Sequence, residues 1–284
     1  MFPDRMDKLV LDGVLNAHQY YNGYETEQVA AVDGTFEGFL AGCVAAPDNC
    51  ALASGNKTVA DLKVAMSDLF DTLKWNPIPF NGTIVDYSSV RTTIYSTLYV
   101  PPYWPRLSNC LNDLLNGDPA AFVQYAAERA AGEGEQDQAF SGIRCGDKSV
   151  RASSASELVP VYDELGRRSK WLGDAVSNMF QDCAQWRFQA KERYEGDFSN
   201  IRTKTPLLFI GNSFDPSTPL VSAQNMSTGF QDSIVLQHNG YGHLSLLQPS
   251  NCTKEVIGKY FVEGTLLEPG TVCEPNAPLF ATAG

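Results

Sequence analysis

The stretch TPLLFIGNSFDPSTPL, from Thr205 to Leu220, decides the fold of this 284-residue chain. It begins with a continuous apolar run of buried-strand length, and SIVLQHNG, from Ser233 to Gly240, is a second such run. The segment between them, STPLVSAQNMSTGF, predicts a short helix, and CTKEVIGKYFVEG after the second run predicts another. Strand, helix, strand and helix in this order predict parallel strands in an α/β sheet.

The sequence before residue 200 has a different pattern. DKLVLDGV, from Asp7 to Val14, predicts one short strand that ends in an Asp-Gly turn. From about residue 20 onward, helical periodicity dominates, as in TVADLKVAMSDLFDTLKW, where we expect Thr58 to be the N-cap. Segments such as NPIPFNG and AAGEGEQDQ predict loops. We therefore expect a core strand in residues 1–20, a helical region in 21–200 and the rest of the sheet in 201–284.

Composition excludes several classes of function. The net charge is −12, and the 21 basic residues form no cluster, so neither nucleic acid nor an anionic membrane surface is an expected partner. No apolar run approaches the roughly 20 residues that span a bilayer. The seven cysteines form no C-x-x-C pair and only three histidines accompany them, so we predict no metal site. No cofactor is expected either.

Cysteines and glycosylation sequons favour an oxidising, secretory environment. The four N-x-[ST] sequons lie at Asn56, Asn81, Asn225 and Asn251. The opening MFPDRMDKLVLDGV, however, has neither the basic region nor the apolar region of a signal peptide. Two interpretations follow: a cytosolic protein with reduced thiols and chance sequons, or a secreted protein whose natural beginning is absent here.

Asp215 and His243 are the candidate catalytic residues. Taken singly, Asp215 before Pro216 is a good helix N-cap, and His243 in NGYGHLS is a typical loop residue. Together they occupy successive strand ends, acid first and histidine second, which is the chain order in α/β-hydrolases. In a catalytic triad the imidazole accepts the serine proton while the carboxylate orients the ring and stabilises the imidazolium. Gly242 would allow the sharp turn that this requires.

Other candidates are weaker. Asp12 ends its strand and is an alternative acid, although a turn-forming Asp-Gly explains it better. His238 ends its strand with no specified role, and His18 is expected to be exposed. No G-x-S-x-G elbow for a nucleophile is present, and Ser245 is too close to His243 to replace it. The predicted triad therefore has no nucleophile in this chain.

At this point the sequence resembles a known family. TPLLFIGNSFDPSTPL and NGYGHLSLLQPSNCTKEVIGKYFVEGTLLEPGTVCEPNAPLF resemble the C-terminal domain of tripeptidyl aminopeptidase-like α/β-hydrolases, which are secreted relatives of prolyl aminopeptidases. MFPDRMDKLVLDGVLNAHQYYNGY is similar to the segment after their nucleophile helix, and FEGFLAGCVAAPDNCALA to the start of their helical cap. The D-P-x-T-P and G-x-G-H elements are the most specific, whereas residues 60–195 match more loosely.

The resemblance implies an incomplete α/β-hydrolase core, formed by the C-terminal strands of a mostly parallel sheet, with a large helical cap. It implies that Asp215 is the triad acid and His243 the base, and that serine, oxyanion donors and further strands lie upstream. It also suggests disulfides Cys43–Cys50, Cys145–Cys183 and Cys252–Cys273, with Cys110 left over, although sequence alone does not determine the pairing. Acidic residues of the cap would hold the α-amine of a peptide substrate.

The expected function is that of the C-terminal portion of a secreted serine exopeptidase that cleaves near the N-termini of peptides. One alternative is an esterase-type hydrolase, since related folds host both activities. The other alternative is a catalytically inactive fragment, or a binding protein of the same fold, whose reduced sheet has an exposed edge. The sequence does not determine the oligomeric state.

Overall fold

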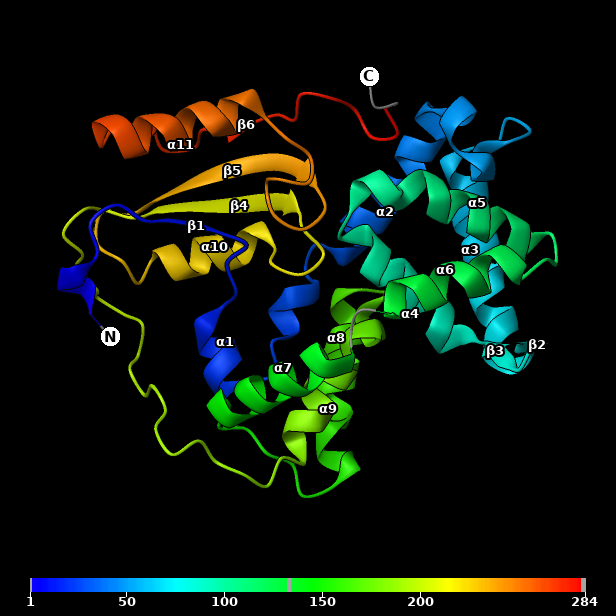
Figure 1. Cartoon of the computed structure of the whole chain (residues 1–284), viewed down its shortest axis with the longest axis horizontal. Helices are drawn as coiled ribbons and strands as arrows, with labels where there is room; N and C mark the ends of the chain where they lie inside the picture. Colours follow the sequence, from blue (N-terminus) through cyan, green and yellow to red (C-terminus); the bar gives the residue numbers. More distant parts are fainter. Residues whose placement is uncertain (1, 132–133, 282–284) are drawn as a thin grey trace.

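The computed structural model describes residues 2–131 and 134–281 and has an α/β architecture (Figure 1). Within these residues, the central sheet consists of β1 (Val10–Asp12), β4 (Leu208–Phe214), β5 (Ile234–Tyr241) and β6 (Val272–Cys273). The strands lie in the order β1-β4-β5-β6, and each neighbouring pair is parallel. The prediction of an α/β fold with a mainly parallel sheet is confirmed.

The apolar run of β4 is buried on both faces of the sheet. Successive side chains of a strand point to opposite faces. Leu208 and Ile210 pack in the cluster under α11 (Asn251–Glu263), and Phe209 packs in the cluster against α10 (Leu220–Ser227). The two helices accordingly cover opposite faces of the sheet, as Figure 1 shows. A strand covered on both sides needs a continuous apolar sequence, which explains TPLLFIGN.

Most of the helices lie between β1 and β4 in the sequence. Their bounds are α1 (Ala17–Asn22), α2 (Val32–Ala45), α3 (Val59–Trp75), α4 (Tyr87–Leu98), α5 (Trp104–Leu115), α6 (Ala120–Ala130), α7 (Gly134–Asp147), α8 (Val159–Arg168) and α9 (Asn178–Ala184). Short 3-10 helices join the elements: η1 (Pro3–Arg5), η2 (Thr26–Val29), η3 (Pro47–Asn49), η4 (Ala51–Ala53), η5 (Pro101–Tyr103), η6 (Ala155–Leu158) and η7 (Gly173–Val176). No helix of the described chain combines the length and apolarity that crossing a bilayer requires.

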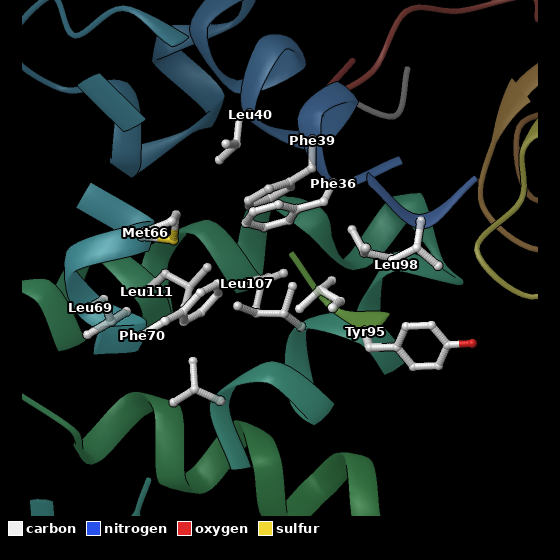
Figure 2. Close-up of a cluster of buried hydrophobic side chains, with 14 of the residues drawn as sticks. Phe36, Phe39, Leu40, Met66, Leu69, Phe70, Tyr95, Leu98, Leu107 and Leu111 are labelled. Carbon is white, nitrogen blue, oxygen red and sulfur yellow. The ribbon is translucent and has the colours of Figure 1, made fainter. Parts of the chain in front are cut away.

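These helices share one large apolar core, part of which Figure 2 shows. Phe36 and Phe39 of α2 meet Met66 of α3 and Leu98 of α4 in this buried cluster. The apolar spacing of three and four residues that predicted α3 corresponds to its buried face. Whether the domain boundaries at residues 20 and 200 describe folding units stays a prediction.

Helix α3 begins as the sequence predicts. The hydroxyl of Thr58 accepts a hydrogen bond from the backbone N of Asp61 at 3.2 Å, and the carboxylate of Asp61 accepts one from the backbone N of Thr58 at 2.8 Å. This reciprocal pair satisfies two of the backbone donors that a helix start leaves free. The prediction of Thr58 as N-cap is confirmed.

The segment that was predicted as a loop, NPIPFNG, instead contains one arm of a β-hairpin. Strand β2 (Ile78–Phe80) pairs antiparallel with β3 (Thr83–Val85). The connecting residues Asn81 and Gly82 both have positive φ, at 45° and 79°. Asn-Gly is a strong hairpin signal, because these two residues adopt that backbone conformation at low cost. The loop prediction was wrong because it took Pro and Gly as markers of an irregular loop and did not consider Asn81-Gly82 as a hairpin turn.

Three disulfides tie the elements together. Cys43–Cys50 links the end of α2 to the start of η4, Cys145–Cys183 links α7 to α9, and Cys252–Cys273 links α11 to β6. These are the pairs that the family resemblance suggests, and they are confirmed. Cys110 is the free cysteine and is buried in α5. Disulfides of this kind persist in oxidising compartments, which is compatible with a secreted protein.

A buried ionic cluster joins α7 to the loop after α1. Glu25 Oε2 lies 2.5 Å from Nη2 of Arg144 and 2.6 Å from Nζ of Lys148, and all three side chains are almost fully buried. Lys148 also donates hydrogen bonds to three carbonyl oxygens at the end of α1. It therefore satisfies the free carbonyls of that helix end.

Candidate active site

Two loops at one edge of the sheet bring Asp215 and His243 together. Asp215 directly follows β4, and His243 follows β5 after Gly242. Because β4 and β5 are parallel neighbours, their carboxyl ends lie side by side. Nδ1 of His243 lies 3.1 Å from Oδ2 of Asp215 and 3.3 Å from its Oδ1. The structure thus places in contact the two residues that the sequence places at successive strand ends.

The carboxylate of Asp215 is fully buried, with 0% of the residue exposed. Its Oδ1 accepts hydrogen bonds from the backbone N of Ser217 and Thr218, both at 2.8 Å, and its Oδ2 accepts one from the backbone N of Leu244 at 3.0 Å. Burial by itself raises the pKa of this carboxyl, but the hydrogen bond and charge of His243 and the backbone donors outweigh it. The net result is a lowered pKa, so a charged carboxylate faces the imidazole.

The structure also tests the interpretation of Asp215 as a helix N-cap. Helix α10 begins at Leu220, and its N-cap is Pro219, which makes no side-chain cap. Asp215 is therefore not the N-cap of this helix. It closes a tight turn over residues 215–218 instead, so the same hydrogen bonds that shape the loop also hold the carboxylate beside His243.

The loop that carries His243 needs two residues in the left-handed backbone conformation. Gly242 has φ +89° and Leu244 has φ +70°. A Cβ at Gly242 would lie 2.4 Å from Cδ of Pro101, so glycine is required by space as well as by conformation. The buried amide of Asn212 donates a hydrogen bond to the carbonyl of Gly242 at 2.7 Å and holds the turn against β4.

The C-terminal end of helix α4 contacts both loops of the candidate site. The carbonyl of Tyr99 accepts a hydrogen bond from the backbone N of His243 at 2.8 Å, and the two rings lie 5.2 Å apart. The hydroxyl of Tyr95 donates to the carbonyl of Pro216 at 3.1 Å. Sequence reasoning treated these tyrosines only as residues of a helical pattern. Their signal was the four-residue spacing in IYSTLYV, which places both on one helix face.

The imidazole of His243 has one engaged nitrogen and one open nitrogen. The contact with the carboxylate assigns the proton to Nδ1, which leaves a lone pair on Nε2. No residue of the described chain hydrogen-bonds Nε2, and 30% of the side chain is exposed. A buried carboxylate, an oriented ring and an open Nε2 are the features that a general base of the triad type requires.

Thr218 is a third member of the site that sequence reasoning missed. Its Oγ1 lies 2.7 Å from Oδ2 of Asp215 and 3.2 Å from Nδ1 of His243. The hydroxyl therefore touches both partners at their point of contact. The signal was present in the D-P-x-T-P element, which identified the family resemblance but gave no role to the threonine.

Asp12, the alternative acid, is hydrogen-bonded to Ser245 in the structure. Asp12 ends β1 beside β4, as predicted, but its Oδ2 accepts a hydrogen bond from the hydroxyl of Ser245 at 2.7 Å and lies 3.2 Å from the backbone N of the same residue. The carboxylate of Asp12 thus binds Ser245, two residues after His243, whereas the imidazole of His243 contacts Asp215. Gly13 after it has φ +74°, in agreement with the predicted Asp-Gly turn.

The other histidines lie away from Asp215. His238 is fully buried within β5, where Nδ1 lies 3.0 Å from the hydroxyl of Thr253 and Nε2 lies 3.1 Å from the carbonyl of Gln248. It therefore does not approach the candidate site. His18 is exposed, as predicted, and its ring packs edge-on against Phe198. Across residues 2–131 and 134–281, no three His, Cys, Asp or Glu side chains gather as a metal site would need.

Comparisons with known proteins match the part of the chain that contains this site. A family model described as TAP-like protein matches residues 169–273. Residues 169–273 are therefore a TAP-like segment. This TAP-like segment contains both Asp215 and His243, as well as Thr218, Tyr241 and the disulfide at Cys252–Cys273. The predicted resemblance to TAP-like α/β-hydrolases is confirmed.

Three curated relatives align with nearly the whole chain. "Putative hydrolase YuaR" of Escherichia coli strain K12 is 23% identical over 287 residues, which is 95% of this chain and 53% of that protein. Carboxylesterase B of Mycobacterium tuberculosis is 22% identical over 293 residues, or 96% of this chain and 53% of that protein. Serine protease Hip1 of the same species is 21% identical over 295 residues, or 96% and 54%. The chain spans about half the length of these relatives.

Proposed function

We propose that this chain carries the acid and the base of a serine-hydrolase triad. The observation that supports this most directly is the contact of 3.1 Å between the buried carboxylate of Asp215 and Nδ1 of His243, with Nε2 left open. Both residues lie in the TAP-like segment. The names of the relatives, a carboxylesterase and a serine protease among them, also point to acyl-group hydrolysis.

The proposed reaction uses one proton relay twice. Nε2 of His243 takes the proton of a serine hydroxyl as that oxygen attacks the acyl carbon of the substrate. Asp215 keeps the ring in position and stabilises the imidazolium that forms. His243 then gives the proton to the leaving group, and an acyl-enzyme remains. Water repeats the sequence and releases the acyl product, so the imidazole returns to its starting state.

The serine hydroxyl would come from polypeptide outside these 284 residues. The chain has no G-x-S-x-G motif. In the described sheet, β1 is an edge strand, and only its β4 side is paired. An unpaired parallel edge is a surface on which another strand can add. A strand in that place would end beside Asp12 and close to His243, at the carboxyl edge of the sheet where the proposed chemistry occurs.

The proposed substrate is a peptide, cleaved near its N-terminus. This choice rests on the resemblance to tripeptidyl aminopeptidase-like enzymes and on the helical region whose α4 reaches both catalytic loops. A covering region of this kind limits access to the ends of chains. The second candidate activity is ester hydrolysis, which the relative named Carboxylesterase B favours. The disulfides support a secreted location for the complete protein.

Active-site labelling tests this function. The longest natural polypeptide that includes these residues is treated with a serine-directed fluorophosphonate, in parallel with the 284-residue chain alone. We expect one labelled serine in the longer protein and none in the chain alone. Asp215→Asn should lower kcat by about 10⁴ and His243→Ala by about 10⁶, whereas exposed His18→Ala should leave kcat unchanged.

Substrate pairs then separate the candidate activities. A peptide anilide with a free α-amine, its N-acetylated form and a short-chain ester are compared at equal concentrations. Preference for the free-amine peptide supports the exopeptidase, and preference for the ester supports the esterase. A longer protein that neither labels nor turns over any of them would leave the third alternative, an inactive binding protein of this fold.

A further inference from the structure

We propose that Asn81 is an N-glycosylation site whose first sugar packs on Phe80 and stabilises the β2–β3 hairpin. This inference is independent of the proposed hydrolase function. The hairpin lies at the outer edge of the helical region, where Figure 1 shows it beyond the end of α3. It carries the sequon Asn81-Gly82-Thr83 at its turn.

The turn presents the sequon in an ordered and accessible form. Phe80 and Thr83 are paired across the hairpin, so Asn81 and Gly82 form a two-residue connection. Positive φ at both turn residues is the geometry of a type I′ turn, which matches the twist of the strands. Asn81, Gly82 and Thr83 are all exposed. The amide that would be modified and the hydroxyl that the sequon requires are therefore both at the surface.

The modification is a group transfer to the side-chain amide. Nδ2 of Asn81 bonds to C1 of an oligosaccharide carried by a lipid diphosphate. The bond between C1 and the diphosphate oxygen breaks, the lipid diphosphate leaves, and the amide nitrogen loses one proton. No oxidant or reductant is needed. The donor is a lipid-linked oligosaccharide of the secretory pathway, and the transferring enzyme of that pathway takes the proton.

Phe80 gives the first sugar a surface to pack against. It directly precedes Asn81 and is half-buried, so part of the side chain is accessible. Thr83, its cross-strand partner, borders the same face of the hairpin. A pyranose ring has an apolar face of C–H groups, which gains dispersion and hydrophobic contact when it lies on an aromatic ring. A sugar on Asn81 can therefore join both strands of the hairpin.

The sequons on α10 and α11 do not offer this arrangement. Nδ2 of Asn225 donates a hydrogen bond of 2.6 Å to Oε2 of Glu27. Asn251 begins α11, and Thr253 of its sequon is buried with its hydroxyl 3.0 Å from Nδ1 of His238. We infer that these two asparagines carry no sugar in the folded chain. A glycan on Nδ2 of Asn225 would disturb its bond to the buried Glu27, and Thr253 is buried, whereas Thr58 and Thr83 of the other two sequons are exposed.

Asn56 is the matched control. It is exposed and has φ +59°, like a turn asparagine, but Gly55 precedes it where Phe80 precedes Asn81. A sugar on Asn56 therefore has no neighbouring ring on which to pack. We expect it to be modified without any gain in stability.

The test is secretion of the whole chain from a eukaryotic host, followed by glycopeptide mass spectrometry. We expect sugar at Asn81 and Asn56 and none at Asn225 or Asn251. In an Asn56→Gln background, an amidase that removes the entire glycan should lower Tm by about 2–4 °C. An endoglycosidase that leaves a single N-acetylglucosamine should not lower Tm, because the first sugar makes the contact with Phe80.

Phe80→Ala decides whether the ring is the cause. Because the variant itself weakens the hairpin, the comparison is made within it, between glycosylated and amidase-treated protein. We expect Thr83→Ser to keep the glycan and its Tm effect, and Phe80→Ala to keep the glycan and lose the effect. An unmodified Asn81, an equal Tm shift in Phe80→Ala, or sugar at Asn225 or Asn251 would each overturn the inference.

Discussion

The carboxylate of Asp12 accepts a hydrogen bond of 2.7 Å from the hydroxyl of Ser245. This bond joins the end of β1 to the loop that carries His243. Leu244, which lies between His243 and Ser245, has φ +70°. This left-handed backbone conformation costs a non-glycine residue about 1 kcal/mol or more. The backbone N of Leu244 donates to Asp215 at 3.0 Å. Asp12 at the end of β1 and Asp215 just after β4 therefore hold the segment from His243 to Ser245 in place.

We expect Asp12→Asn to loosen this loop. The amide cannot accept from Ser245 as strongly as the carboxylate does, so the free energy of unfolding should fall by about 1–3 kcal/mol. Urea unfolding measures this change, and the exposed Asp4→Asn is the control for loss of one surface charge. Because the two residues share one hydrogen bond, Ser245→Ala combined with Asp12→Asn should cost less than the sum of the single changes. Full additivity would mean that the bond carries no stability.

Asp215 should make stability depend on acid pH. Its pKa in the folded chain is below the ordinary value of 3.8, so the unfolded chain binds the proton first as pH falls. Its contribution is therefore fully present above about pH 5 and is lost as pH falls through the lowered folded value. In urea titrations, wild type should exceed Asp215→Asn in stability near neutral pH by a margin that shrinks below about pH 4. A margin independent of pH would contradict the lowered pKa.

His238 should give a second pH dependence, at a higher pH. Burial is the main cause that lowers its pKa below 6.5, and the neutral ring already satisfies both nitrogens, with Nε2–H donating to Gln248. The unfolded chain therefore takes up a proton near pH 6.5 that the folded chain refuses. The contribution of His238 is fully present above that pH and falls as the pH is lowered towards the folded pKa. His238→Gln should reduce the loss of stability between about pH 7.5 and pH 5.5, and exposed His18→Gln should not.

Some contacts of this site follow from local sequence patterns, and these can be predicted from the sequence. Others depend on how distant elements pack, and these cannot. The continuous apolar runs dictate buried parallel strands, and parallel neighbours must end together, so the meeting of Asp215 and His243 follows from pattern alone. The contact of Tyr99 with His243 does not follow, because it depends on where α4 packs. Helical periodicity reports which face is buried and gives no information about which loop that face meets.

The contact of Asp12 with Ser245 depends on packing in the same way. Strand order allows an acid at the end of β1 to approach the histidine loop, and it does so. Which residue of that loop it binds depends on the left-handed turn at Leu244, and a leucine gives no signal for such a conformation. The β2–β3 hairpin is a different case, because the dipeptide Asn81-Gly82 is itself a strong sequence signal for a two-residue hairpin turn. Giving this dipeptide more weight than the neighbouring prolines would have predicted the hairpin.

The buried cluster of Glu25, Arg144 and Lys148 should be the most sensitive ionic group in the chain. One carboxylate faces two cations, at 2.5 and 2.6 Å, and Glu25→Gln would leave both cations buried without a counter-charge. Removing one partner of a buried ion pair costs about 3–5 kcal/mol, because the desolvated charge left behind has no compensation. Urea unfolding should show this loss, whereas Glu128→Gln, which breaks the exposed pair with Arg106, should change stability little.

The same variant has a diagnostic pH dependence. Burial is the main cause that lowers the pKa of Lys148, and the charge of Glu25 opposes that shift, so Glu25→Gln should lower this pKa further. The unfolded chain then holds a proton that the folded chain has released, and stability rises with pH between the folded and unfolded pKa values of the lysine. We therefore expect the defect of Glu25→Gln to shrink between about pH 7 and pH 9, and Lys148→Met in the same background to remove that recovery. A defect that stays constant over this range would show that the loss comes from packing and not from the unpaired charge.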